Sequence, residues 1–331
     1  MHKIAKRVVA VASLSVIALA GCESFLDVNK NPNAPVSARV DLTLPGVIGV
    51  FGHSVLGGSL AFWSVEWMQQ FSFNGNNRAY SNLHRYEVTT TDAGGPWSTI
   101  FATVMKESNN IMADTEGKDD FAYHGIAKFF FNWSFTIAAD AWGPIPFEQA
   151  FNTAIRDPKY DEQKVVYAGA QKAIDEAIEE MAKPARSPGT VDLLYKGDMV
   201  KWVKLANTVQ GILHMHLTNA PGETKTDRAQ KALTALAKGM TSNADDADFA
   251  YPGGNNRRPP WYAIGRGNTD GTFVISEYLV EMMKARNDPR VPIYARPAPS
   301  DTPNAIVPTP GTGMGITPTS MPSATPSPIE M

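Results

Sequence analysis

The sequence predicts a mainly α-helical fold, and three observations support this prediction. Apolar residues recur three and four positions apart in two long segments, Val165–Ala182 and Gly197–Asn219, which is the spacing of an amphipathic helix. A third segment, Asp119–Trp142, is apolar nearly all round and should lie at the centre of a core. Strand signals are weak apart from the short run YEVTTT at Tyr86–Thr91, so helices dominate the expected architecture.

The chain starts with the pattern of a lipoprotein signal peptide. Residues 1–7 carry three basic residues and no acid, and residues 8–20 are apolar or small. This apolar run is too short to span a bilayer, which needs about 20 residues. Leu19-Ala20-Gly21-Cys22 then has the form of a lipobox. We expect residues 1–21 to be removed and Cys22 to carry diacylglycerol, which with further acylation is a stable membrane anchor.

The alternative is a cleaved signal followed by a chance cysteine, but Cys22 is the single cysteine of the chain. Residues 22–40 are rich in Asn, Pro and Asp and should form a tether, because these residues favour turns and extended chain over helix. Removal of residues 1–21 takes away three basic residues and no acid, leaving 27 basic against 33 acidic residues. We expect no basic surface, and nucleic acid is therefore excluded as a partner.

The helices can be justified in chain order. Gly95–Met112 and Asp119–Trp142 are the first two long apolar or amphipathic segments. In the segment Val165–Ala182 one stripe is apolar and the other side is charged. The apolar stripe consists of Ala170, Ala173, Ile174, Ala177, Ile178 and Met181.

In Gly197–Asn219, Asp198 is placed to cap the helix start and Pro221 follows its end. Trp202 and Leu205 begin its apolar stripe. Amphipathic antiparallel helices joined by a loop are the unit of tetratricopeptide-like arrays.

Several motifs stand in a fixed order along the chain. They are LDVNKNPNAP after Cys22, DAWGPIPFEQA at Asp140–Ala150, and blocks within Asp157–Met181, Tyr195–Asn219 and Ser276–Pro297, the last containing NDPR. Together they resemble the SusD/RagB family of nutrient-binding outer-membrane lipoproteins, especially its SusD-like subgroup. The resemblance covers most of the chain.

The resemblance implies tetratricopeptide-like helix pairs with long irregular loops, a SusD-like α-α superhelix. It implies a lipid-anchored outer-membrane protein, facing the cell exterior, that captures an oligosaccharide or peptide and passes it to a SusC-like TonB-dependent barrel. We expect the helical ligand-binding domain at residues 41–295 and a Pro/Thr/Ser-rich loop or tail at residues 296–331. Because family members are longer, we interpret the chain as truncated at its C-terminus and this domain as incomplete.

Two polar loops rich in aromatic residues, Gln69–Glu87 and Tyr251–Asn268, are the candidate ligand sites. Aromatic rings stack on the C–H face of a sugar while Asn and Arg bind its hydroxyls, and the same groups suit peptides. Alternatively, the rings pin the loops to the core. The resemblance favours the first loop. The candidate residues are Phe73, Asn74, Asn77, Arg78, Tyr80, Asn255, Trp261 and Tyr262.

Other tryptophans are expected to serve packing. Trp97, Trp133 and Trp202 fall inside helical patterns and should belong to the core. Trp63 and Trp67 are one turn apart on an expected helix. We interpret that pair as a core or partner contact rather than a ligand contact.

No metal or cofactor pattern stands out, and we expect no group beyond the lipid on Cys22. His214 and His216 are two positions apart, which places them on different sides of a helix, so they cannot clasp one metal. The acidic run Asn243–Asp248 lacks the spaced carboxylates and terminal Glu of a calcium loop.

No catalytic motif stands out either, so we expect a binding protein and not an enzyme. Asp140 precedes Gly143-Pro144 at an expected helix end, where a turn or capping role is favoured over catalysis. A surface glycan hydrolase is the first alternative, because folding can bring any two acids together, and Glu66, Asp140 and Glu148 are the acids to test. A helical-repeat adaptor without a small ligand is the second alternative.

Overall fold

The protein was analysed as a computed structural model. The structure describes residues 39–73, 83, 86–254, 258–266, 273–297 and 329–330. Cys22 lies outside the described residues, and so do the candidate ligand residues Asn74, Asn77, Arg78, Tyr80 and Asn255. The elements below belong to the compact unit that begins at Val40.

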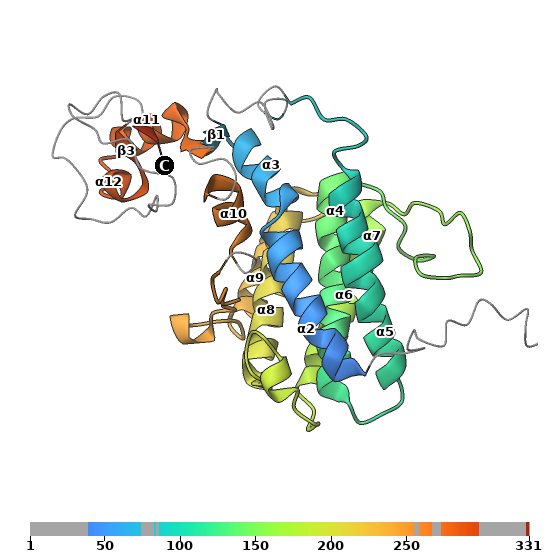
Figure 1. Cartoon of the computed structure of the whole chain (residues 1–331). Helices are drawn as coiled ribbons and strands as arrows, with labels where there is room; N and C mark the ends of the chain where they lie inside the picture. Colours follow the sequence, from blue (N-terminus) through green and yellow to red (C-terminus); the bar gives the residue numbers. More distant parts are fainter. Residues whose placement is uncertain are drawn as a thin grey trace, which may run out of the picture. The chain divides into compact units, whose positions relative to one another are not determined.

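Helices dominate the described residues (Figure 1), which confirms the predicted fold class. The first half contains α2 (Val40–Val50), the π-helical turn η1 (Phe51–Leu56), α3 (Ser59–Trp67), α4 (Gly94–Ser98), the π-helical run η3 (Thr99–Met105), α5 (Lys106–Thr115) and α6 (Phe121–Trp142). The second half contains α7 (Gln163–Met181), α8 (Met199–His216), α9 (Lys225–Leu236), α10 (Pro260–Arg266), α11 (Glu277–Ala285) and α12 (Val291–Tyr294). Single 3₁₀ turns are η4 (Gly189–Val191), η5 (Leu217–Asn219) and η6 (Asn243–Asp245).

The core is centred on α6, as its all-round apolar sequence predicts. Phe129 and Phe130 of α6 are fully buried, and the ring of Phe130 lies 5.5 Å from that of Trp202 on α8 and 4.8 Å from that of Phe51. The first pair is edge-to-face and the second is tilted, and aromatic pairs at these distances are favourable contacts beyond their burial. Truncating a fully buried aromatic side chain lowers the free energy of unfolding by about 3–5 kcal/mol. Contacts between these rings are therefore important for how the helices pack.

A buried aspartate organises the turn that leads into α8. Asp192 is fully buried, and one of its oxygens accepts bonds from the indole N–H of Trp202 and the backbone N–H of Gly197, both 2.8 Å long. Gly197 has a φ of +85°, a conformation that favours glycine. As predicted, Asp198 then caps α8 by accepting from the N–H groups of Val200 and Lys201.

Contacts between α6, α7 and α8 show that successive helices run antiparallel. His124 near the start of α6 contacts Glu180 near the end of α7, whereas Asp140 near the end of α6 contacts Tyr167 near the start of α7. Tyr167 also contacts His216, the last residue of α8. We call the two ends of the α6–α7 pair the His124 end and the Asp140 end.

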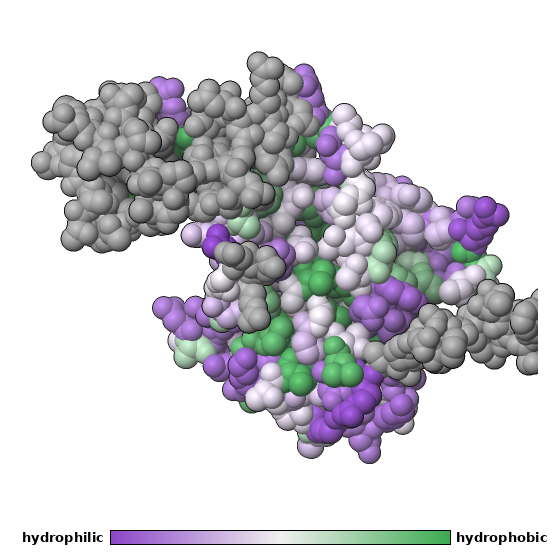
Figure 2. All heavy atoms as spheres, viewed as in Figure 1, coloured by the Kyte–Doolittle hydropathy of each residue, from purple (hydrophilic) through white to green (hydrophobic). Residues whose placement is uncertain are grey.

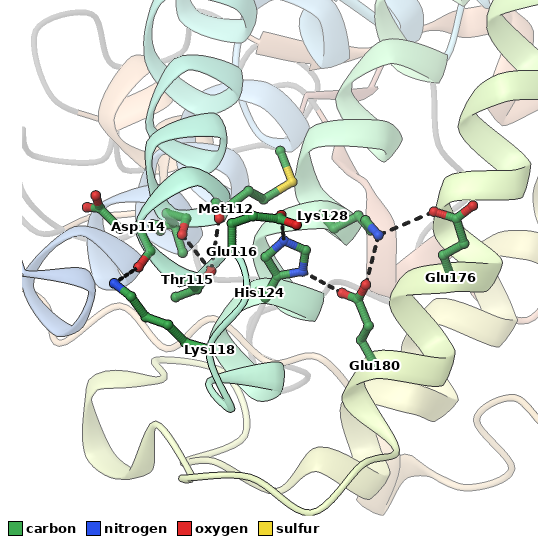
Figure 3. A network of polar contacts seen from close by, with 10 residues as sticks. Met112, Asp114, Thr115, Glu116, Lys118, His124, Lys128, Glu176 and Glu180 are labelled. Atoms are coloured by element: carbon green, nitrogen blue, oxygen red, sulfur yellow. Dashed lines mark hydrogen bonds and ion pairs between the residues drawn. The ribbon is translucent and has the colours of Figure 1, made fainter.

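At the His124 end, charged side chains bond one another across the helices (Figure 3). Glu180 accepts from Nδ1 of His124 at 2.6 Å and from Nζ of Lys128 at 2.8 Å. Glu116 and Glu176 complete the group at 3.4 Å from His124 and 3.3 Å from Lys128. Burial acts to raise the pKa of the Glu180 carboxyl, but the bonds from Lys128 and His124 hold it below its ordinary value.

Strands play a small part in the described residues. β1 (Phe71–Phe73) pairs antiparallel with β2 (Phe273–Ile275), and β3 (Arg296–Pro297) pairs with β4 (Ile329–Glu330). The strand-like run Tyr86–Thr91 forms coil and turn, so that prediction was wrong. Tyr86 has a φ of +57°, which an extended strand cannot accommodate.

Among the described residues, the stretch Val40–Trp67 is long and apolar enough to cross a membrane by length and composition. A core helix passes the same test, and Leu44, Ile48 and Phe51 of this stretch are buried in the core. Apolar side chains also lie on the outer surface over α2 (Figure 2), where Leu42 is 70% exposed.

Candidate functional site

A groove of about 470 Å³ opens at the Asp140 end of the bundle, a size typical of small-ligand sites. It lies between α3, the segment before α4 and the end of α6. Its walls include Leu60, Trp63, Trp67, Ile137, Asp140 and Trp142. All three tryptophans are half-buried, so each packs part of its ring and leaves part of it accessible. We call this cavity the tryptophan groove.

Trp63 and Trp67 lie on one face of α3 because they are four residues apart. Their ring centroids are 5.9 Å apart and the rings are inclined by 36°. The indole N–H of Trp67 donates to the carbonyl of Leu83 at 3.2 Å, and the ring of Tyr86 stacks 6.3 Å away at 26°. These contacts hold the ring of Trp67 in place before any ligand binds.

Trp142, the last residue of α6, is supported from behind by other aromatic rings. Its ring meets that of Trp97 edge to face at 5.2 Å, and Trp97 in turn stacks on Phe101 at 4.2 Å. Trp97 packs against the core, as the sequence predicts. The groove therefore has a rigid aromatic wall whose positions depend on the core.

Asp140 supplies the charged group of the groove. Its Oδ1 accepts a bond of 2.5 Å from the buried hydroxyl of Tyr167, and its Oδ2 lies 3.4 Å from Nδ1 of His216. Burial, and then the Asp140 carboxylate, raise the pKa of Tyr167 far above its ordinary value, so this hydroxyl keeps its proton. The side chain of Asp140 is still 44% exposed, so it can also accept bonds from a ligand. Asp140 thus bonds or faces side chains of α7 and α8, which differs from the turn or capping role that the sequence favours.

Aromatic faces beside a fixed carboxylate suit a sugar. The rings can stack on the apolar face of a pyranose while the carboxylate accepts from its hydroxyl groups. Among the described residues, no group of three or more His, Cys, Asp or Glu side chains is placed to hold a metal ion.

The described candidate residues of the two loops lie elsewhere. Trp261 on α10 packs edge-on against Phe62 at 4.6 Å and Phe71 at 5.6 Å, so it joins α10 to α3 and β1. Tyr262 is 43% exposed, and the guanidinium of Arg258 lies 5.2 Å from its ring centre. Phe73 ends β1 and pairs with Phe273. Trp261 and Tyr262 are not among the residues that line the groove.

Sequence reasoning missed Trp63, Trp67 and Trp142 as site residues. The signal available was the pair of tryptophans at i and i+4, which the sequence interpretation assigned to a core or partner contact. The pair is half-buried, which is compatible with packing and with ligand contact at the same time.

A family described as starch-binding and associating with the outer membrane, of the SusD-like type, matches residues 61–327. A solved SusD/RagB family protein from Bacteroides thetaiotaomicron is similar with a TM-score of 0.68 and 26% identity, over 77% of this chain and 53% of its own. A chitin-binding protein matches with a TM-score of 0.66 and 21% identity, over 79% and 56%. A SusD homolog from Bacteroides fragilis matches with a TM-score of 0.62 and 20% identity, over 80% and 54%.

The chain thus spans about half the length of these solved structures. No curated protein matches it.

Proposed function

This chain belongs to the SusD-like family, and from that premise we propose that it binds oligosaccharides in the tryptophan groove without cleaving them. The half-buried, pre-positioned rings of Trp63, Trp67 and Trp142 beside Asp140 carry this proposal. A peptide is the second possible ligand class, but flat aromatic faces next to a carboxylate favour the alternating apolar and hydroxyl faces of a sugar. The matching family is described as starch-binding and one similar protein as chitin-binding, which supports this choice.

We further propose that the protein acts at the cell surface. Cys22 would carry the lipid that anchors the chain to the outer membrane, and a SusC-like TonB-dependent barrel would receive the bound glycan. Modest affinity suits this role because the cargo must leave again. Expression with the barrel and co-purification from detergent-solubilised outer membranes tests the partner. Labelling of intact cells with a membrane-impermeant reagent tests the exterior orientation.

The binding test uses the mature chain with Cys22→Ser, titrated calorimetrically with maltooligosaccharides, chitooligosaccharides and a set of peptides. We expect oligosaccharide binding that Trp67→Ala weakens at least tenfold, about 1.4 kcal/mol, because a central aromatic anchor is lost. Trp261→Ala tests the second loop, because this ring belongs to that loop and does not line the groove.

Each outcome of this test leads to a different function. Loss of binding in Trp261→Ala but not in Trp67→Ala would move the site to the second loop. Release of shorter sugars during incubation would show that the protein is a glycan hydrolase and not only a binding protein. Absence of any binding to folded protein would favour the adaptor.

A further inference from the structure

A second cavity, of about 700 Å³, lies at the same end of the bundle. It is formed by the start of α7, the end of α8, η5 and the start of α9. Its lining includes Asp140, Tyr167, Ala168, Asn219, Glu223 and Arg228. We call this cavity the polar cleft. The tryptophan groove and the polar cleft share one lining residue, Asp140.

In the wall of the polar cleft, Arg228 bonds two neighbouring side chains. Nε of Arg228 donates to Glu223 at 2.7 Å, and its Nη1 donates to Nδ1 of His214 at 3.2 Å. Because a guanidinium can only donate, His214 accepts at Nδ1 and is neutral. Burial and the charge of Arg228 lower the pKa of His214, in agreement with this geometry.

The mixture of acidic and basic groups in its wall makes a neutral ligand the best match for the polar cleft. Three carboxylates, on Asp140, Glu162 and Glu223, stand against the cations Lys164 and Arg228. An anionic ligand would meet this excess of carboxylates, and a cationic one would meet Arg228 and Lys164. Hydroxyl groups, which donate and accept, can bond both kinds of wall group without desolvating an unpaired charge.

Asp140 joins the two cavities, because it lines both of them. Its two oxygens face Tyr167 and His216, which belong to the helices of the polar cleft, while its neighbour Trp142 lines the tryptophan groove. A ligand that leaves the groove past Asp140 therefore meets the polar cleft next. Both volumes lie within the range of about 300–1,000 Å³ that is usual for ligand sites.

We propose that the natural ligand is an extended, neutral oligosaccharide that spans both cavities, with its first sugars stacked in the tryptophan groove and later sugars hydrogen-bonded in the polar cleft. This inference rests on the proposed function, because it requires sugar binding in the groove. It adds that the protein selects for chain length, and that Asp140 contacts the ligand where it crosses from one cavity to the other.

The test compares a short and a long ligand of the same series. Maltotriose and maltoheptaose, and chitotriose and chitohexaose, are titrated against the mature chain with Cys22→Ser. We expect the longer sugar of the bound series to bind at least tenfold more tightly, a gain beyond the statistical effect of its additional registers. Equal affinity for short and long sugars would overturn the inference and leave the proposed function standing.

The variant Ala168→Phe tests whether the tighter binding of the longer sugar comes from the polar cleft. Ala168 is exposed on α7 and lines the polar cleft, so phenylalanine would fill the cleft without removing a polar contact. We expect the variant to lose the tenfold gain of the long sugar and to keep the affinity for the short sugar within twofold. A gain that survives in the variant would overturn the inference.

Val165→Phe is the matched control, because Val165 is also exposed on α7 but does not line the cleft. Asn219→Trp fills the cleft from η5 and serves if Ala168→Phe does not fold. Trp67→Ala should weaken both sugars. Absence of sugar binding to the folded wild-type chain would overturn the proposed function, and this inference with it.

Discussion

The two ends of the α6–α7 pair differ in how their polar groups are satisfied. At the His124 end, Lys128 and His124 both bond Glu180, so the charges find partners within the fold. At the Asp140 end, the carboxylate is bonded by Tyr167 yet remains 44% exposed, and the tryptophans around it are only half-buried. The comparison shows that one helix pair can hold an end whose charges pair within the fold and an end whose carboxylate and aromatic rings stay available to a ligand.

Two glutamates differ in a similar way, because their pKa values are shifted in opposite directions. Glu180 is stabilised in its charged form by Lys128 and His124, and its pKa is lowered despite burial. Glu66 lies on α3, the helix that carries Trp63 and Trp67, and burial raises its pKa to about 7. The first glutamate contributes to stability when ionised, and the second when protonated.

The largest expected effect is on stability at the His124 end. Glu180→Ala leaves Lys128, whose side chain is 19% exposed, without its main partner. Removing one partner of a largely buried ion pair costs about 3 kcal/mol. We expect a loss of this size in the free energy of unfolding, measured by urea denaturation at pH 7, and sugar affinity unchanged within twofold.

The lowered pKa of Glu180 predicts how this loss depends on pH. Its contribution is complete above the ordinary glutamate pKa of 4.5 and disappears as the pH falls through the lowered value. The difference between wild type and Glu180→Ala should therefore shrink in acid. Glu176→Ala is the control, because Glu176 is 47% exposed and should cost less than about 1 kcal/mol. Equal effects of the two variants would contradict the stabilising role of the ion pair between Glu180 and Lys128.

A smaller effect on stability, with the opposite pH dependence, is expected from Glu66. Because its pKa is raised from 4.5 to about 7, its contribution is complete below pH 4.5 and is lost as the pH rises through 7. We expect stability to fall by about 2 kcal/mol between pH 5 and pH 8, less than the full linkage value because part of the change lies outside this pH range. Glu66→Gln should flatten this part of the profile in urea titrations. A profile that Glu66→Gln leaves unchanged would show that another group titrates.

The sequence predicts the long helices better than the segments between them, and packing explains why. Helix periodicity gave the segments that became α6, α7 and α8, because each buries one continuous stripe or all of its surface. The cap of α8 by Asp198 was also predicted, since the partners of a cap lie within a few residues. Tyr86–Thr91 was mispredicted because its β-branched residues suggest a strand, whereas strand pairing depends on a distant partner.

The candidate site could be predicted only in its chemistry. Aromatic and polar residues in a binding role were expected, but the groove draws on α3, on residues before α4 and on the end of α6. No local pattern reports that Asp140 and Tyr167, 27 positions apart, lie within 2.5 Å. Periodicity also cannot tell a buried tryptophan from one that leaves part of its ring open, which is the property that separates Trp202 from Trp67.

The smallest expected effect comes from Tyr167, which orients the open end without closing it. Tyr167→Phe removes the 2.5 Å bond to Asp140 while keeping the ring packed between α6 and α8. If Asp140 contacts the sugar, a freed carboxylate should weaken the binding of the longer oligosaccharide about threefold, below 1 kcal/mol. Calorimetric titration measures this change in affinity, and Tyr160→Phe, at an exposed tyrosine away from both cavities, is the control.

Because its raised pKa keeps Tyr167 protonated, the wild-type affinity should show no titration of this hydroxyl near pH 10. A change in affinity in Tyr160→Phe equal to that in Tyr167→Phe would show that Asp140 needs no such orientation.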